Sequence, residues 1–241
     1  MELKICHLYP DILNLYGDRG NVFCLEKRLE WRGIGADVTR MPLGSAASLA
    51  GFDIVFAGGG QDFLRPALLD ELRRGRAAEI KAAIEDGVTF LTVCGGFQLL
   101  GNYFEDAKGN KTELIGAVDM YTLAGTKRNI GNYKFKCSED AGGSTVIGFE
   151  DHSGCSYLAK GINPLGTVLS GFGNNGSDKG EGVHYKNVFG TYSHGPVLPK
   201  NPEFCDHILL TALKRKYGTA ELAALDDSAE LAAHELMNAK L

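Results

Sequence analysis

The fold is best predicted from Val88-Thr89-Phe90-Leu91-Thr92-Val93-Cys94-Gly95-Gly96-Phe97-Gln98. A largely apolar run ends at Cys94, and an apolar stretch with helical character follows directly. This order predicts a strand, a tight turn and a helix, with a thiol at the apex of the turn. Such a turn lifts a nucleophile above the sheet edge, and the N-terminal end of the helix favours a thiolate. A buried structural cysteine is the alternative, but a packing cysteine does not need two glycines after it. Cys94 is therefore predicted to be a nucleophile.

The first hundred residues alternate between strand-like and helical patterns. Strands are predicted at 3–8, 36–41, 53–57 and 88–93, and helices at 22–31 and 66–85. This alternation favours a parallel sheet covered on both faces, with functional loops at the carboxyl ends of the strands. Gly58-Gly59-Gly60 and Cys94 both fall at such ends.

The second half of the chain carries more glycine and more strand-like segments. These segments lie at 116–123, 133–137, 145–149, 167–169 and 188–192, and helices are predicted at 202–217 and 220–238. We therefore expect an α/β fold, a three-layer sandwich with a mostly parallel central sheet, in a single domain spanning residues 1–241.

Composition excludes several classes of protein. The net charge of −5 provides no basic field for nucleic acid, and no apolar stretch approaches membrane-spanning length. The six cysteines are scattered without Cys-x-x-Cys pairs, so no metal site is expected. No signal sequence is recognised, and a soluble, cytoplasmic protein is expected.

A thiolate nucleophile needs a base and an oxyanion site. His194 follows the strand-like run at 188–192 and precedes Gly195-Pro196, so it lies at another junction of strand and loop. Gly59 and Gly60 could direct backbone N–H groups at an oxyanion, together with Gly95. The glycines could instead form a flexible turn or a loop that binds phosphate. The chain lacks the Gly-x-x-x-x-Gly-Lys-Ser/Thr motif of a P-loop, which argues against the phosphate-binding alternative.

Several motifs resemble class I glutamine amidotransferases. The segment at 94–98 resembles their Cys-x-Gly-x-Gln nucleophile motif, and residues 58–62 match their oxyanion loop. Residues 148–154 and 190–195 resemble the cobyric-acid-synthase branch. Within that branch, Leu-Tyr-Gly-Asp-Arg-Gly-Asn at 15–21 and the segment at 194–202 resemble the GatD family, the glutaminase subunits of lipid II isoglutaminyl synthase.

The resemblance implies a flavodoxin-like amidotransferase fold and a heterodimeric enzyme. In that family the subunit pairs with MurT, a Mur-ligase-like protein, and the complex amidates the α-carboxyl of D-glutamate in lipid II during peptidoglycan synthesis. The resemblance implies no cofactor in this chain, with ATP and Mg on the partner subunit. L-glutamine is the implied substrate.

The resemblance also assigns roles to residues. Cys94 would attack the glutamine amide, His194 would move the protons, and Gly60 and Gly95 would form the oxyanion hole. Two further residues would bind substrate: Arg128, holding the glutamine carboxylate, and Gln98, shaping the pocket. For both of these an ordinary surface position is the alternative.

One feature departs from the larger family, and other functions stay open. His-x-Glu is replaced by His194-Gly195-Pro196, so the carboxylate that orients the imidazole is missing from its usual place. In the GatD branch the resemblance implies that an aspartate of MurT completes the site, so the isolated chain is expected to be a poor glutaminase. The alternatives are an amidotransferase component for a corrinoid acceptor, a non-catalytic partner-binding module, and a peptidase or γ-glutamyl hydrolase.

Overall fold

A six-stranded sheet forms the centre of the molecule. The computed structural model describes residues 1–218 and 220–241, without the side chains of residues 61 and 62. The strand order is β11-β12-β4-β3-β1-β2, and all neighbours run parallel except the antiparallel pair β11 and β12. The strands are β1 (Glu2–Leu8), β2 (Gly35–Met41), β3 (Ile54–Ala57), β4 (Thr89–Val93), β11 (Val183–Tyr185) and β12 (Val188–Thr191).

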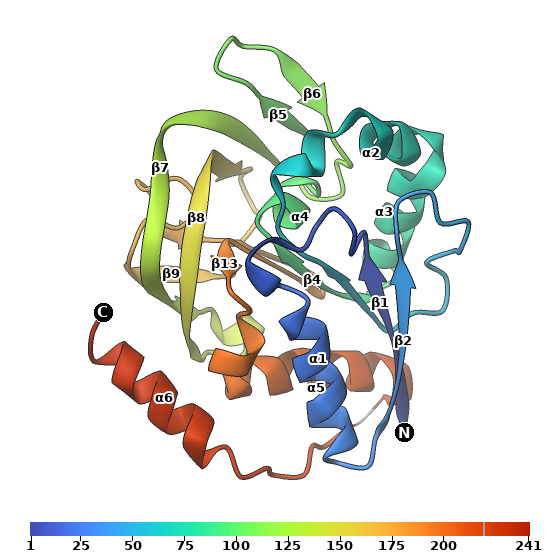
Figure 1. The fold of residues 1–241 in the computed structure, drawn as a ribbon, viewed down its shortest axis with the longest axis vertical. Helices are drawn as coiled ribbons and strands as arrows, with labels where there is room; N and C mark the ends of the chain where they lie inside the picture. Colours follow the sequence, from blue (N-terminus) through green and yellow to red (C-terminus); the bar gives the residue numbers. More distant parts are fainter. Residues whose placement is uncertain (219) are drawn as a thin grey trace.

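Helices cover both faces of this sheet, as the sequence predicted (Figure 1). Every residue of β3 and β4 is buried, which explains why β3 is apolar throughout and why β4 departs from this only at two threonines, without a regular alternation of polar and apolar residues. The helices are α1 (Gly20–Glu30), α2 (Pro66–Glu71), a π-helical segment (Leu72–Arg76), α3 (Ala77–Glu85), α4 (Gly95–Gln98), α5 (Pro202–Tyr217) and α6 (Ser228–Asn238). The buried apolar side chains of strands and helices form one cluster, which runs from Leu3 to Leu213.

The second half of the chain builds another sheet beside the first. Its strands are β5 (Tyr103–Glu105), β6 (Lys111–Glu113), β7 (Met120–Cys137), β8 (Thr145–Leu158), β9 (Gly166–Ser170), β10 (Gly180–Glu181) and β13 (Ser193–His194). The two strands predicted at 116–123 and 133–137 fall in the single long strand β7, except that residues 116–119 precede it and are not in a strand. The middle of β7 is polar, but it stays in the strand because it pairs with β8 in an antiparallel ladder. The pairing has one irregularity, between Ala124 and Asn129.

The last helix begins later than predicted. The sequence predicted a helix from residue 220, whereas α6 starts at Ser228; residue 219 lies outside the described residues. Asp227 is held by Arg28, with an Nη1–Oδ1 distance of 2.6 Å, and the Asp226 carboxylate accepts from the backbone N–H of Ser228. These two contacts hold the residues directly before α6 away from a helical path, so the helix begins only at Ser228.

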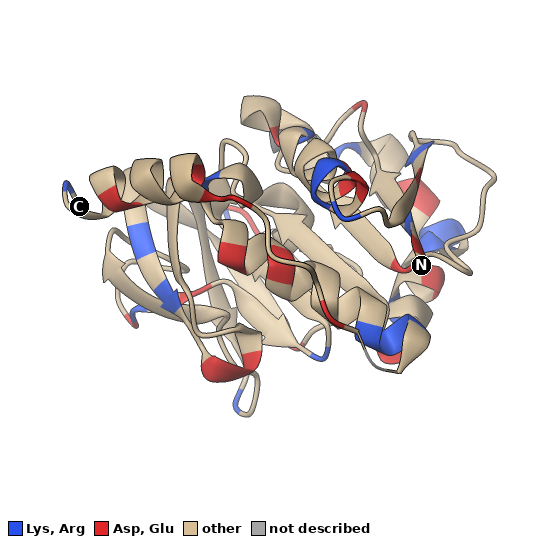
Figure 2. Ribbon diagram, turned by 90° about the horizontal axis from the view of Figure 1, so that it is seen from below, with Lys and Arg blue, Asp and Glu red and all other residues tan. Residues whose placement is uncertain are grey.

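A basic run at 214–216 lies in the last turn of α5. Figure 2 shows these basic residues at the end of the helix near the N-terminus of the chain. Lys216 Nζ lies 2.8 Å from Asp53 Oδ2 and also donates to the carbonyl of Glu2. The basic residues thus complement the helix dipole and tie α5 to the start of the chain. Within the described residues, no helix is both long enough and apolar enough to cross a membrane.

Candidate active site

Cys94 occupies a strained turn between β4 and α4. Its φ and ψ are 48° and −107°, a backbone conformation that non-glycine residues rarely adopt. The two following glycines are required by close backbone approach: a Cβ on Gly95 would collide with the carbonyl oxygen of Gly60, and one on Gly96 would lie 2.7 Å from that of Gly58. The prediction of a strand, a tight turn and a helix with a thiol at the apex is confirmed.

His194 lies directly beside Cys94 on β13. This strand pairs with β8, with His194 opposite Phe149, so the imidazole sits where the two sheets meet. The ring is fully buried, and its Nδ1 lies 3.1 Å from Asp18 Oδ2. This contact leaves Nε2 for the Cys94 thiol. Burial lowers the pKa of His194, but the hydrogen bond with Asp18 and the adjacent Cys94 sulfur outweigh it and raise the pKa to about 10. The imidazolium is therefore the resting form at neutral pH.

Asp18 brings a carboxylate of this chain to the His194 imidazole. Its side chain is fully buried, and Oδ2 accepts from the N–H of Gly59 at 2.8 Å as well as contacting His194. The sequence analysis did not predict this contact, because the usual His-x-Glu is missing and the fold brings this carboxylate from a loop 176 residues away. That an aspartate of MurT completes the site stays a prediction. The available signal was the motif at 15–21, in which Asp18 is the one acidic residue.

The loop at 58–60 approaches both catalytic candidates. It follows β3, and a Cβ on Gly60 would lie 2.5 Å from the carbonyl oxygen of Ile12. A Cβ on Gly95 would lie 3.3 Å from the Gly60 nitrogen, so these two peptide groups are neighbours. Among the described residues, neither the N–H of Gly60 nor that of Gly95 has a hydrogen-bond partner. Both donors are therefore available to an oxyanion. Of the matched motif at 58–62, the last two side chains lie outside the described residues.

Gly59→Ala is expected to displace the imidazole and lower activity about tenfold. A Cβ at this position would lie 2.9 Å from His194 Nδ1 and closer still to Cε1, in the space where Asp18 also reaches the ring. The measurement is the rate of ammonia release from glutamine. Gly44→Ala serves as a control for the loss of a glycine without a steric contact, since no atom lies within 4 Å of its Cβ position; its positive φ adds a backbone strain that is absent at Gly59. Equal activity of Gly59→Ala and wild type would contradict this geometry.

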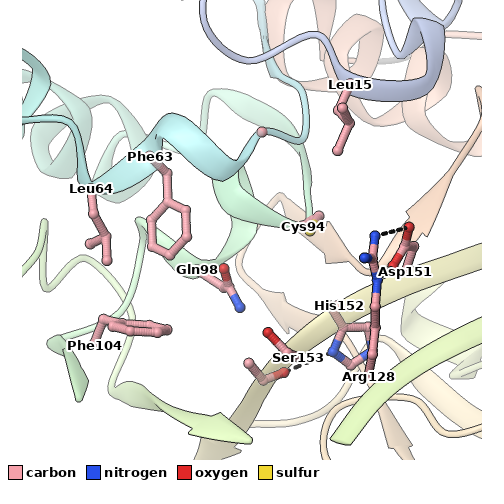
Figure 3. Close-up of a pocket in the computed structure, with 12 residues that line it drawn as sticks. Leu15, Phe63, Leu64, Cys94, Gln98, Phe104, Arg128, Asp151, His152 and Ser153 are labelled. Atoms are coloured by element: carbon pink, nitrogen blue, oxygen red, sulfur yellow. Dashed lines mark hydrogen bonds and ion pairs between the residues drawn. The ribbon is translucent and has the colours of Figure 1, made fainter. Parts of the chain in front are cut away.

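A cavity of about 290 Å³ opens in front of Cys94 (Figure 3). This volume is near the lower end of the range for small-molecule sites. The cavity brings together the predicted residues Cys94, Gly60, Gln98 and Arg128, while His194 is buried behind the thiol. It is lined by Leu15, Gly60, Phe63, Leu64, Cys94, Gln98, Phe104, Arg128, Asp151, His152, Ser153 and Gly154.

Gln98 is a buried pocket residue, so the surface alternative is wrong. Its side chain is 3% exposed, and Nε2 donates to the Tyr192 hydroxyl at 3.0 Å. That hydroxyl also lies 2.7 Å from Ser156 Oγ. The ring of His152 stacks on Tyr192 with centroids 3.6 Å apart. This packing holds the Gln98 amide at the floor of the pocket.

Arg128 reaches the pocket from the irregularity in β7. Its side chain is 54% exposed, yet both Nε and Nη2 donate to the buried carboxylate of Asp151. Arg128 is therefore not an isolated surface arginine, because it forms an ion pair with a buried carboxylate at the pocket. Asp151 is a second residue that the sequence analysis did not select, because it follows the glutamate within the matched segment at 148–154 and no pattern distinguished it.

Comparisons with known proteins identify the class to which this fold and site belong. Residues 4–202 match the CobB/CobQ-like glutamine amidotransferase domain family. The chain resembles the solved structure of PurLQS from Thermotoga maritima, with a TM-score of 0.60 and 19% identity over 89% of this chain and 99% of that one. It also resembles the glutaminase domain of Trypanosoma brucei CTPS with bound acivicin, with a TM-score of 0.54 and 13% identity over 92% and 98% of the two chains. At these identities the structures establish the fold alone.

The sequence relatives narrow the class. The chain is 42% identical, over 94% of its length and 86% of the relative, to the lipid II isoglutaminyl synthase (glutamine-hydrolyzing) subunit GatD of Streptococcus pneumoniae. It is 40% identical to the GatD subunit of Staphylococcus aureus over 98% and 95% of the two chains. A probable cobyric acid synthase of Methanococcus maripaludis is 33% identical over 60% of this chain but only 30% of that protein. The chain therefore belongs to the CobB/CobQ-like glutamine amidotransferases, and its similarity to GatD subunits spans nearly its whole length.

Proposed function

We propose that this chain is the glutaminase subunit of a lipid II isoglutaminyl synthase. It would hydrolyse L-glutamine through a thioester on Cys94 and deliver ammonia to a MurT-like ligase subunit. The observation that carries this proposal is the buried alignment of Cys94, His194 and Asp18 next to two free backbone N–H groups at a small pocket.

The first half of the reaction forms the thioester. The Cys94 thiolate attacks the side-chain amide carbon of glutamine, and the carbonyl oxygen becomes an oxyanion. The N–H groups of Gly60 and Gly95 are free to donate to that oxygen. When the oxyanion collapses, the C–N bond breaks and His194 gives its Nε2 proton to the leaving nitrogen, which departs as ammonia.

The second half returns the enzyme to its starting state. Neutral His194 takes a proton from a water molecule, and the resulting hydroxide attacks the thioester carbon. Collapse of this adduct expels the Cys94 thiolate and releases glutamate. Throughout, Asp18 holds Nδ1, which fixes the tautomer and stabilises the imidazolium.

Substrate contacts follow from the pocket. Arg128 would bind the α-carboxylate of glutamine, because its planar guanidinium suits bidentate carboxylate recognition. Gln98 would contact the substrate side chain from the pocket floor, where its amide is already oriented by Tyr192. We assign no cofactor or metal to this chain.

The partner follows from the relatives, whose names describe them as subunits. A MurT-like, Mur-ligase-type subunit would carry ATP, Mg and the lipid II acceptor, and this heterodimer would act in the cytoplasm. The corrinoid alternative is less well supported, because the similar cobyric acid synthases match over only 30% of their length. Asp18 would orient the imidazole from within this chain. That a MurT aspartate completes the site, and that the isolated chain is a poor glutaminase, stay predictions of the resemblance.

A complex with a MurT-like subunit is expected to amidate lipid II with either glutamine or ammonium as nitrogen donor. Cys94→Ala should abolish the glutamine-dependent reaction and leave the ammonium-dependent one intact, because only the glutaminase step uses the thiol. The measurement is mass analysis of the lipid II product. Amidation of a corrinoid but not lipid II would support the alternative, and glutamine-dependent amidation by Cys94→Ala would contradict the proposal.

A further inference from the structure

A buried carboxylate that the proposed mechanism does not use lies beside the pocket. The side chain of Asp151, on β8, is 1% exposed, although its partner Arg128 is half exposed. The Arg128 Nη2 lies 2.7 Å from Asp151 Oδ2, and Nε donates to Oδ1. The hydrogen bonds from Arg128 hold the pKa of Asp151 below its usual range despite burial, so the group is charged at neutral pH. This bidentate pair gives a long, mobile side chain one orientation.

The pair leaves half of the guanidinium free. Asp151 engages the edge formed by Nε and Nη2, while Nη1 makes no hydrogen bond to the described residues. A guanidinium carries five N–H groups in one plane, so the outer edge, formed by Nη1 and the second Nη2 hydrogen, can receive another carboxylate bidentately. Figure 3 shows Arg128 and Asp151 together at the wall of the cavity that contains Cys94.

We propose that Asp151 is a positioning residue for amino-acid recognition, which holds Arg128 so that its outer edge receives the α-carboxylate of glutamine. This inference rests on the proposed function and adds a residue that determines specificity. It also explains why a charged group is buried at this point of β8: the carboxylate orients the arginine rather than contacting the reacting atoms.

Tyr16 contacts both the carboxylate clamp, which is the pair formed by Arg128 and Asp151, and the imidazole of His194. The Tyr16 hydroxyl donates to Asp151 Oδ2, and its ring meets the His194 ring edge-on with centroids 5.2 Å apart. Tyr16 has a positive φ of 56° and lies two residues before Asp18. One short loop therefore contacts the carboxylate clamp through Tyr16 and the imidazole through Asp18, so both parts of the site share a single support.

Two electrophiles separate recognition from thiol reactivity. Diazo-oxo-norleucine carries the α-carboxylate of glutamine, and iodoacetamide does not. For Asp151→Asn, the rate of adduct formation at Cys94 is expected to fall about tenfold to a hundredfold with diazo-oxo-norleucine and to stay within about twofold with iodoacetamide. Rates are followed by mass analysis of the Cys94 peptide. Asp119→Asn is the control, because it removes the same charge from an exposed residue that does not line the pocket.

A double-mutant cycle tests whether Asp151 acts through Arg128. On an Arg128→Ala background, Asp151→Asn is expected to cause almost no further loss, since the group that it positions is gone. Wild-type rates of diazo-oxo-norleucine labelling in Asp151→Asn would overturn the inference, as would an equal loss on both backgrounds. A wild-type chain that reacts with iodoacetamide but not with diazo-oxo-norleucine would instead overturn the proposed function.

Discussion

Replacing Cys94 by alanine is expected to reduce glutamine hydrolysis to background, a loss of about four orders of magnitude or more. No other thiol lines the pocket within the described residues, so no second nucleophile can take over the attack on the amide. Binding of glutamine should persist, because Arg128 and Gln98 are unchanged. The measurements are steady-state ammonia release and calorimetric titration of the variant with glutamine.

The control for this variant is Cys155→Ala. Cys155 is a free, partly exposed thiol on β8 that does not line the pocket. Its replacement should leave turnover within about twofold of wild type. Substantial hydrolysis by Cys94→Ala, in preparations free of other glutaminases, would show that the thiol at the turn is not the nucleophile.

Replacing Asp18 by asparagine is expected to lower kcat about a hundredfold to ten-thousandfold, with KM for glutamine changed about threefold or less. Asparagine keeps the shape of the side chain but removes the charge that stabilises the imidazolium of His194. Its amide can also present an N–H to Nδ1, which favours the wrong tautomer. The split between kcat and KM separates this role from that of Arg128, whose loss should mainly raise KM.

The pH profile provides a second, independent readout for Asp18. In wild type the pKa of His194 is raised to about 10, so the proton needed by the leaving ammonia is lost as pH rises through that value. The bond to Asp18 is one cause of this raised pKa, so its removal lowers the pKa. The alkaline limb of kcat/KM should therefore move to lower pH in Asp18→Asn. An unchanged limb and unchanged kcat would mean that a partner carboxylate, rather than Asp18, supports the base.

Local patterns were sufficient to predict the central sheet and the turn that carries Cys94. The strands at 54–57 and 89–93 are buried on every residue, so their apolar character is visible in the sequence itself. The turn at Cys94 is marked by two glycines that close backbone contacts require. These features depend on neighbours in the chain, which is why sequence reasoning found them.

The carboxylates were missed because their partners lie far away in sequence. Asp18 meets His194 across 176 residues, and Asp151 meets Arg128 through the pairing of β7 with β8. The contact that Asp18 makes depends on how the loop at 15–21 folds over the sheet edge, which no local periodicity encodes. Likewise, the sequence does not distinguish Gln98 from an ordinary amide on a helix surface, because its hydrogen bond to Tyr192 joins residues that are distant in the sequence.

The central claim is that Cys94 is a glutamine-selective thiolate activated within this chain. The most direct test is intact-protein mass after exposure of the isolated, folded chain to diazo-oxo-norleucine, with Cys94→Ala alongside. We predict a single adduct on wild type, none on Cys94→Ala, and much slower formation on Asp18→Asn. An adduct that forms only in the presence of a MurT-like partner would contradict activation within this chain. A folded wild-type chain that forms no adduct, with or without the partner, would favour a non-catalytic, partner-binding role for this scaffold.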